Sequence, residues 1–454
     1  MEWEELQEEG HSILAHCKGA SFCEARVEKT DTWSAVISQN RISKIYCVPS
    51  EGITISLYSG NRKTSFSLPG EKVADLKGVV SRFTHSMSDS LPPWMEETET
   101  DSCRLNLGAE IDPLEDTLAM AEWTLQELDS LQNDQCRTTA VVRGGSIKKA
   151  YLNNKEIESE FSCSFSEYNQ YLQSDRGDFG YFNYVHRPPR GSYDTFRTVI
   201  ASVRQVCEAF PSAKLVKPSR CPLVLDAVPF SVLVHEVFGH LLEYDLATMS
   251  CFTRDSLETH ITSPLVTIGD IPSLEDTLYV PFDDEGTIGK EALPVKSGIL
   301  REFLVDRKTA HEIAQVPKGN GRAEGYYYTP MIRSRITVFH PGEHHFEELL
   351  EEAEGGLYLY GVCLVDARPD GTFRLGVPLA YPIRKGELGT PFYGAVISGN
   401  IFDFMNQVGA IGKENQFQAG NCSKGVNGGI QSVKVGTVCP SASFKSWIVE
   451  CDGG

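Results

Sequence analysis

The chain has 454 residues, which is too long for one ordinary core and indicates two or three domains at about 150 residues each. Hydrophobic residues make up 41% and charged residues 23%, so a disordered or low-complexity polymer is excluded, and the apolar runs are too short to cross a membrane. The formal net charge of −20, without a long Lys/Arg cluster, disfavours nucleic acid as a partner.

Two further features indicate a reducing, cytoplasmic location. The first ten residues, MEWEELQEEG, are acidic and lack the basic and apolar regions of a signal peptide. The 13 cysteines are scattered, odd in number and without a CxxC pair. This pattern argues against a disulfide framework or a zinc ribbon, and we expect most of these thiols to be small core side chains.

The first half of the chain reads as a helix followed by strands. Residues 2–17 suit an amphipathic helix, and alternating apolar residues predict β-structure over 21–68. The sequence Asp112-Pro113-Leu114-Glu115 combines a cap, a first-turn proline and a capping-box glutamate, so it predicts a helix to about residue 131. Strand patterns return over 138–165.

Two dipeptides within that last strand region, Gly144-Gly145 and Asn153-Asn154, are candidate turns. The clearest helix is predicted over 193–210, where apolar residues recur at a spacing of 3.6. A polar, proline-bearing stretch then follows from Lys217 to Pro222. We place the domain boundary there, which divides the chain into residues 1–216 and 217–454.

The second half opens with a short buried strand at 223–225 and a helix over 229–244. Many short β-like segments follow, with helices expected over 346–353 and 401–408. Strands and helices do not alternate regularly, so the pattern favours an α+β fold. We expect a mixed α/β sheet domain first and a β-rich domain second, the latter carrying the helix at 229–244.

That helix contains the segment His235-Glu236-Val237-Phe238-Gly239-His240. Two imidazoles that bracket a glutamate on one helix are typical of hydrolytic zinc sites. Each neutral ring offers a nitrogen to Zn²⁺, and the glutamate can take the proton from the attacking water. A helix that holds two histidines by chance is the alternative interpretation.

The spacing of the two histidines requires a distorted helix. They are five residues apart, so on an ideal helix their side chains point about 140° apart. Both reach one metal only if the helix widens locally, as it does at a π-bulge. Gly239 is the residue best able to permit this. We therefore predict an irregular turn around Phe238 and Gly239.

A catalytic zinc site needs a third protein ligand. His311-Glu312 reads as a helix-surface pair, and His344-His345 as a solvated helix start. The remaining candidates are carboxylates and thiolates, which spacing alone does not rank. A thiolate ligand would favour zinc over iron or manganese.

The segment HEVFGHLLEYD resembles the HExxxH signature of the TldD/PmbA family of zinc metallopeptidases, on its TldD-like side. Further matches lie throughout the second half of the chain, whereas the first half matches more loosely. They comprise Asp283-Asp284-Glu285-Gly286, Ser297-Gly298-Ile299-Leu300, Gly319-Asn320-Gly321-Arg322 and Ile397-Ser398-Gly399-Asn400.

The resemblance implies roles for individual residues. The third zinc ligand of the family is a cysteine near the C-terminus, and Asn421-Cys422-Ser423-Lys424-Gly425 at that place implies Cys422. His235 and His240 would be the other ligands and Glu236 the general base. Glu243 would support His240 through its second N–H, unless it forms a helix-end salt bridge or cap.

Arg322 and Arg333 would bind substrate. The chain departs from the family pattern at Ser423, at Ile336 and in extra residues at 426–430, which puts the local loop and the substrate-backbone contacts in question.

The sequence therefore predicts a zinc-dependent peptidase that cleaves flexible or unfolded peptides inside an enclosed dimer chamber. The resemblance implies a homodimer or a heterodimer with a TldE-like subunit. One alternative is a non-catalytic TldE-like partner or scaffold. Another is a metal-dependent amidohydrolase that acts on a small modified peptide, because substrate choice depends on loops and pocket shape.

Overall fold

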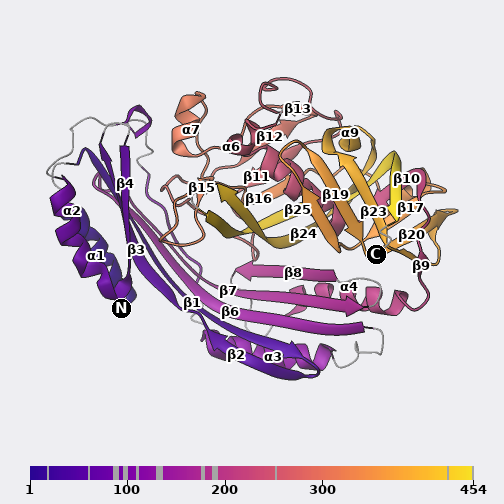
Figure 1. Ribbon diagram of the computed structural model, residues 1–454, viewed down its shortest axis with the longest axis horizontal. Helices are drawn as coiled ribbons and strands as arrows, with labels where there is room; N and C mark the ends of the chain where they lie inside the picture. Colours follow the sequence, from indigo (N-terminus) through magenta and orange to yellow (C-terminus); the bar gives the residue numbers. More distant parts are fainter. Residues whose placement is uncertain are drawn as a thin grey trace.

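Two β-sheets with helices packed against them form the protein (Figure 1). The structure, a computed structural model, describes residues 1–17, 20–59, 62–84, 92–95, 101–108, 112–128, 136–174, 179–186, 193–250, 253–426 and 429–451. This arrangement confirms the predicted α+β class. Among the described residues, no helix is long and apolar enough to cross a membrane.

The N-terminal sheet is built from long antiparallel strands in the order β4-β3-β1-β6-β7. β2 pairs with β1, β8 pairs with β7, and the short β5 runs parallel to β7. The bounds of these strands are β1 Phe22–Ser38, β2 Arg41–Cys47, β3 Ser50–Ser59, β4 Arg62–Pro69, β5 Arg104–Asn106, β6 Cys136–Asn153, β7 Glu158–Ser174 and β8 Phe179–His186.

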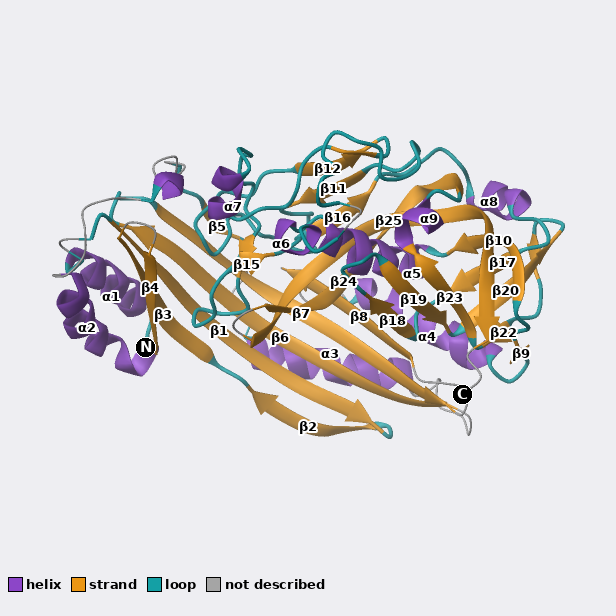
Figure 2. Ribbon diagram, turned by 45° about the horizontal axis from the view of Figure 1, so that its top comes forward, coloured by secondary structure: helices purple, strands orange, loops and turns teal. Residues whose placement is uncertain are grey.

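Helices cover one face of this sheet, and the C-terminal sheet lies against the other (Figure 1; Figure 2). Side chains alternate between the two faces of a strand, so alternate apolar residues of β1 and β6, such as Ala25, Ala35 and Val142, point into the helix-covered core. The helices are α1 Trp3–Ala15, α2 Leu76–Thr84, α3 Pro113–Leu128 and α4 Asp194–Ala209. Three of them match the predicted helices, although the end expected near residue 131 lies outside the described residues.

The predicted turns had different outcomes. β6 ends at Asn153, where the side-chain Oδ1 accepts hydrogen bonds from the backbone N–H groups of Lys155 and Ile157, so the Asn153-Asn154 turn is confirmed. The Gly144-Gly145 turn is wrong, because β6 passes straight through both glycines. A Cβ at Gly145 would lie 2.4 Å from the ring of Phe165. These glycines allow close packing within a strand rather than a reversal of the chain.

The C-terminal sheet has the strand order β13-β12-β11-β16-β25-β10-β17-β20-β22-β9. Its longest strand, β25, pairs with β24, β16, β10 and β23. The chain enters this sheet through β9, before Lys217, and the domain division at that residue stays a prediction.

The strands of this sheet have the following bounds: β9 Lys214–Leu215, β10 Ser219–Leu225, β11 Ile268–Ile271, β12 Ala292–Lys296, β13 Ile299–Leu300, β16 Ile336–Phe339, β17 Leu357–Tyr360, β18 Leu364–Ala367, β19 Thr372–Val377, β20 Leu379–Arg384, β21 Glu387–Leu388, β22 Phe392–Tyr393, β23 Ala395–Asn400, β24 Val408–Val426 and β25 Gly429–Cys451. A separate pair is formed by β14 Gly321–Arg322 and β15 Met331–Ile332. The short helices are α5 Ala227–Leu233, α6 Tyr244–Ala247, α7 Arg307–Glu312, α8 Phe346–Glu352 and α9 Ile401–Met405.

A buried ion pair ties the two halves together. Glu24 of β1 accepts a hydrogen bond from Arg307 of α7 at 2.7 Å, from Tyr58 at 2.6 Å and from Tyr151 at 2.9 Å. Burial alone would raise the pKa of Glu24, but Arg307 and Lys63 outweigh it and lower that pKa to about 2. The carboxylate is therefore charged, and it holds the C-terminal half on the N-terminal sheet.

The close packing at β6 yields a prediction. We expect Gly145→Ala to lower the free energy of unfolding by about 1–3 kcal/mol, because the added methyl group forces Phe165 and the carbonyl of Asp31 apart. Urea unfolding measures the change. The control is Gly78→Ala in α2, whose Cβ meets no described heavy atom within 4 Å and should stabilise the helix slightly. Equal midpoints for Gly145→Ala and the wild type would contradict the packing.

Candidate metal centre

The helix that carries the two histidines begins directly after a buried strand. β10 ends at Leu225, and the side chain of Asp226 accepts a hydrogen bond from the backbone N–H of Val228 at 3.2 Å. Tyr358 donates its hydroxyl to the same carboxylate at 2.8 Å. Asp226 therefore caps α5, which starts two residues before the predicted Pro229.

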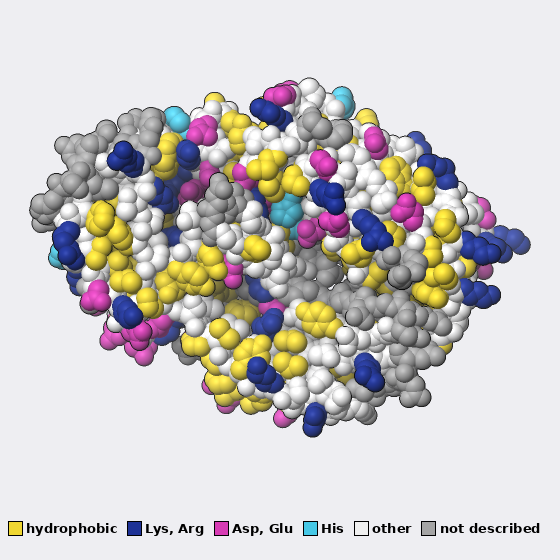
Figure 3. Space-filling view, viewed as in Figure 1, with side chains coloured by type: hydrophobic (Ala, Val, Ile, Leu, Met, Phe, Trp, Pro, Cys, Tyr) yellow, Lys and Arg dark blue, Asp and Glu magenta, His cyan; other side chains and the backbone are white. Residues whose placement is uncertain are grey.

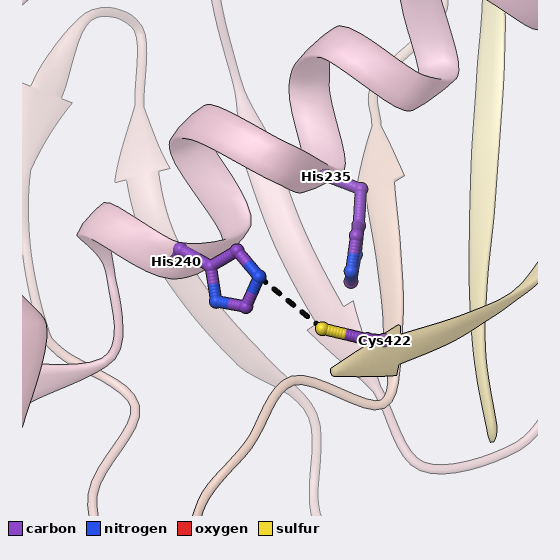
Figure 4. A group of neighbouring side chains, drawn as sticks. All are labelled: His235, His240 and Cys422. Atoms are coloured by element: carbon purple, nitrogen blue, oxygen red, sulfur yellow. Dashed lines mark hydrogen bonds between the residues drawn. The ribbon is translucent and has the colours of Figure 1, made fainter. Parts of the chain in front are cut away.

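The turn after α5 is a π-helix, Val234–Gly239. Its hydrogen bonds connect residues five apart, so such residues lie on the same side. The ring centroids of His235 and His240 are 5.5 Å apart, and both rings face the same space (Figure 4). The predicted irregular turn is confirmed, and it starts four residues earlier than expected. Gly239 lies against His235, where a Cβ would be 3.4 Å from Nδ1.

Cys422 reaches the histidines from a distant part of the sequence. It lies in β24, opposite Val433 of β25, and its side chain is buried. The Sγ atom is 3.2 Å from Nε2 of His240, as the dashed line in Figure 4 shows. One ligand atom from each of His235, His240 and Cys422 lies within 4.8 Å of the other two.

These three residues fit a zinc ion. His235 is 5% exposed, and neither of its ring nitrogens has a hydrogen-bond partner in the described part of the chain. A buried polar group without a partner is unfavourable, and a bound cation would satisfy one of the two nitrogens. Two imidazole nitrogens and one thiolate match a zinc site with three protein ligands and an open position.

The charge state of Cys422 suits metal binding. Burial alone would raise the pKa of its thiol, but the neighbouring His235 and His240 outweigh burial and lower that pKa to about 5. The residue is therefore a thiolate at neutral pH, which is the form that binds metal.

Glu236 lies beside the three candidate ligands. Its Oε2 is 3.8 Å from Nε2 of His240, and its side chain is 33% exposed. A carboxylate that is both close to the ligands and open to solvent is placed to exchange protons with water and substrate.

Glu243 supports His240 from the other side of the ring. Its Oε2 is 3.2 Å from Nδ1 of His240, so Nδ1–H can donate to the carboxylate and leave Nε2 for a metal. Burial would raise the pKa of Glu243, but Lys424 and then His240 hold it well below its usual range. The alternative of a helix-end salt bridge applies as well, because Lys424 donates to the same oxygen.

Arg322 and Arg333 both donate to backbone carbonyls. Arg333 is fully buried and binds the carbonyl oxygens of Cys422 and Gln431. Arg322 donates to the carbonyls of Ser334 and Lys434 at 2.6 and 2.7 Å. These contacts hold the β24–β25 hairpin in place, and a direct role in substrate binding stays a prediction.

The pair His344-His345 and two other cysteines near the C-terminus lie apart from the three candidate ligands. His345 forms the start of α8 in a capping box with Glu348, as the sequence indicated. Cys439 is fully buried in the C-terminal core, and Cys451 packs against that core. None of them joins the group around His235 in the described residues.

One contact was not predicted from the sequence. In the sequence Lys424 stands out only as part of the Cys422 motif, yet its Nζ lies 2.7 Å from Oε2 of Glu243. Residues two apart on a strand share a face, so its position two residues after Cys422 was the available signal. That signal needed the strand assignment of 408–426, which the sequence pattern did not give.

Two histidines and a cysteine with an adjacent carboxylate form a donor set that is typical of metal-dependent hydrolases. The family model described as "PmbA/TldA metallopeptidase C-terminal domain" matches residues 218–450. The chain therefore belongs to the PmbA/TldD family of metallopeptidases.

Individual relatives agree with this assignment. The chain is 28% identical over 368 residues to "Metalloprotease" of Archaeoglobus fulgidus, which covers 78% of this chain and 83% of that protein. It is 31% identical over 231 residues to "Zinc metalloprotease TldD homolog" of Saccharolobus solfataricus, and that match spans about half of each protein (50% and 51%). Its fold is similar to that of TldE from Thermococcus kodakarensis, with a TM-score of 0.75 at 15% identity over 97% of this chain and 99% of that one.

The geometry predicts metal content. We expect about one zinc per chain in purified protein and loss of that zinc in Cys422→Ser, because a neutral hydroxyl is a far weaker ligand than a thiolate. Elemental analysis after dialysis measures both. The exposed Cys363→Ser is the matched control and should retain zinc. Equal zinc in Cys422→Ser and the wild type would contradict the ligand assignment.

Proposed function

We propose that this protein is a zinc-dependent peptidase that hydrolyses peptide bonds of flexible or unfolded peptides. The observation that carries the proposal is the convergence of His235, His240 and Cys422 on one point, with Glu236 beside them. The printed name of the Saccharolobus solfataricus relative, a zinc metalloprotease, supports zinc as the metal.

In this mechanism His235, His240 and Cys422 would hold the metal. A bound zinc ion would polarise the peptide carbonyl and lower the pKa of the attacking water. Glu236 takes the proton from that water at its carboxylate and passes it to the leaving amine. A thiolate donates more charge than a neutral ligand and would make a bound metal a weaker Lewis acid, so Glu236 would carry a larger share of catalysis.

The family assignment and the partly exposed carboxylate of Glu236 support a peptide substrate. A cavity of about 420 Å³ lies between the two sheets on the Asn421 face of β24, and its lining includes Arg322 but none of the three candidate ligands. In this proposal an extended peptide would pair through its main chain with an exposed strand near the site. Arg322 and Arg333 would contribute to substrate binding by holding the strands around Cys422, since both donate to backbone carbonyls there.

We also propose that the active form is an enclosed dimer in the cytoplasm, either a homodimer or a heterodimer with a TldE-like subunit. The similarity in fold to TldE of Thermococcus kodakarensis over nearly the whole chain supports such pairing. On the face shown in Figure 3, basic and acidic side chains are interspersed among the described residues, which is consistent with a partner other than nucleic acid.

The proposed base predicts a specific loss of activity. We expect Glu236→Gln to lower kcat on a reduced, alkylated and therefore unfolded polypeptide by about 10²–10⁴-fold, because the amide cannot accept the proton. Zinc content should remain at the wild-type value, since Glu236 is not a ligand in this proposal. The control is Glu4→Gln on α1, an exposed carboxylate in the N-terminal half.

Three other results would redirect the proposal. Equal rates for Glu236→Gln and the wild type would remove Glu236 as the base. A zinc-loaded wild type that cleaves neither unfolded polypeptide nor short blocked peptides would favour the non-catalytic partner. Cleavage of short blocked peptides alone would favour an amidohydrolase of small modified peptides.

A further inference from the structure

Lys424 is a buried cation next to the metal centre that the mechanism does not use. It lies two residues beyond Cys422 on β24, so both side chains leave the same face of the strand. Its side chain is 3% exposed. Nζ donates to Oε2 of Glu243 at 2.7 Å, to Oδ1 of Asp245 at 2.8 Å and to the carbonyl of Ile332 at 2.9 Å. All three donors of the ammonium group are therefore occupied.

Glu243 connects this cation to a metal ligand. Its carboxylate is fully buried, and Oε2 receives Lys424 while lying 3.2 Å from Nδ1 of His240. The other oxygen, Oε1, accepts a hydrogen bond from the backbone N–H of Ser334 at 2.9 Å. One carboxylate thus joins the ammonium group, the imidazole ring and the backbone.

The same strand consequently holds His240 from both sides of its ring. Cys422 lies against Nε2, and Lys424 acts on Nδ1 through Glu243. The ring is kept with Nε2 directed to Cys422, as Figure 4 shows. A histidine whose second nitrogen is held by a carboxylate has a defined tautomer and a defined orientation toward metal.

The positive charge matters in this position because a buried carboxylate needs a charged partner. Arg333 also favours the charged form of Glu243, but its hydrogen bonds go to the carbonyls of Cys422 and Gln431. Lys424 is thus the cation in direct contact with Glu243 among the described residues. Asp245 shares the ammonium group, whereas the hydrogen bonds and ion pairs of His240 within the described part of the chain go to Glu236, Glu243 and Cys422.

We propose that Lys424 is a positioning residue of the metal centre, which holds Glu243 so that the ring of His240 is oriented for zinc before the metal binds. The inference rests on the proposed function, because it concerns the affinity of the same site. Removal of residues that orient metal ligands typically costs 10–100-fold in metal affinity, and we expect a loss in this range.

The test measures zinc affinity and not activity. The full-length chain is stripped with a chelator and titrated with Zn²⁺ against a chromophoric competitor. The set comprises the wild type, Lys424→Met, Glu243→Gln and the double variant. We expect each single variant to lose about 10–100-fold in affinity. The double variant should match Glu243→Gln alone, because Lys424 acts through Glu243 and the two losses are not additive.

Two controls separate positioning from a general structural effect. Asp245→Asn removes the second anionic partner of Lys424 without touching His240, and it should keep the wild-type zinc affinity. The visible spectrum of the Co²⁺-loaded protein reports ligand geometry, and it should change in Lys424→Met but not in Asp245→Asn. If Lys424→Met does not fold, the comparison of Glu243→Gln with the double variant, in which neither charge is buried alone, carries the test.

Distinct results refute the proposed function and this inference. A wild type that binds no zinc overturns the proposed function. A wild type that binds zinc, with Lys424→Met of equal affinity, overturns the inference and leaves the function standing. Additive losses in the double variant also overturn it, because they would mean that Lys424 acts independently of Glu243.

Discussion

The metal centre depends on one distortion of the backbone, the π-helical turn Val234–Gly239. On a regular helix, side chains five residues apart point about 140° away from each other, so His235 and His240 could not bind the same metal ion. The wider turn brings their ring centroids to 5.5 Å. Such a turn is less stable than a regular helix, so the packing around it must hold it in place. Val234, Val237 and Phe238 provide this packing, because their side chains are buried in the C-terminal core.

The second requirement is that β24 delivers Cys422 at the same point. Long-range contacts meet this requirement: Arg333 binds the carbonyl of Cys422, and the β24–β25 pairing sets which side chains face the helix. Cys422 and Lys424 take one face of β24, whereas Asn421 takes the other and lines the cavity between the sheets. The β24–β25 hairpin therefore positions the candidate ligand Cys422, helps to orient the ring of His240 and forms part of the wall of the cavity.

The parts of this structure that could be predicted from the sequence are local. The apolar face of α4 and the widened turn at Gly239 follow from neighbouring residues and were confirmed. The same holds for the cap before α3, where Oδ1 of Asp112 accepts hydrogen bonds from the backbone N–H groups of Leu114 and Glu115. The failures are non-local. The pair Gly144-Gly145 has the composition of a turn, and only the packing of the strand against Phe165 shows why glycine is needed there. The contact of Lys424 with Glu243 depends on the position of β24 beside the metal-site helix, which is not a local property. The candidate ligand Cys422 came from family resemblance, since no spacing rule connects it to residues about 180 positions earlier.

The central claim is that one zinc ion binds to two imidazole nitrogens and one thiolate in this protein. X-ray absorption at the zinc edge of the zinc-loaded chain tests it most directly. We expect two nitrogen neighbours at about 2.0–2.1 Å and one sulfur at about 2.3 Å, with a light atom in the fourth position. A first coordination sphere without sulfur, or with more than one sulfur, would contradict it.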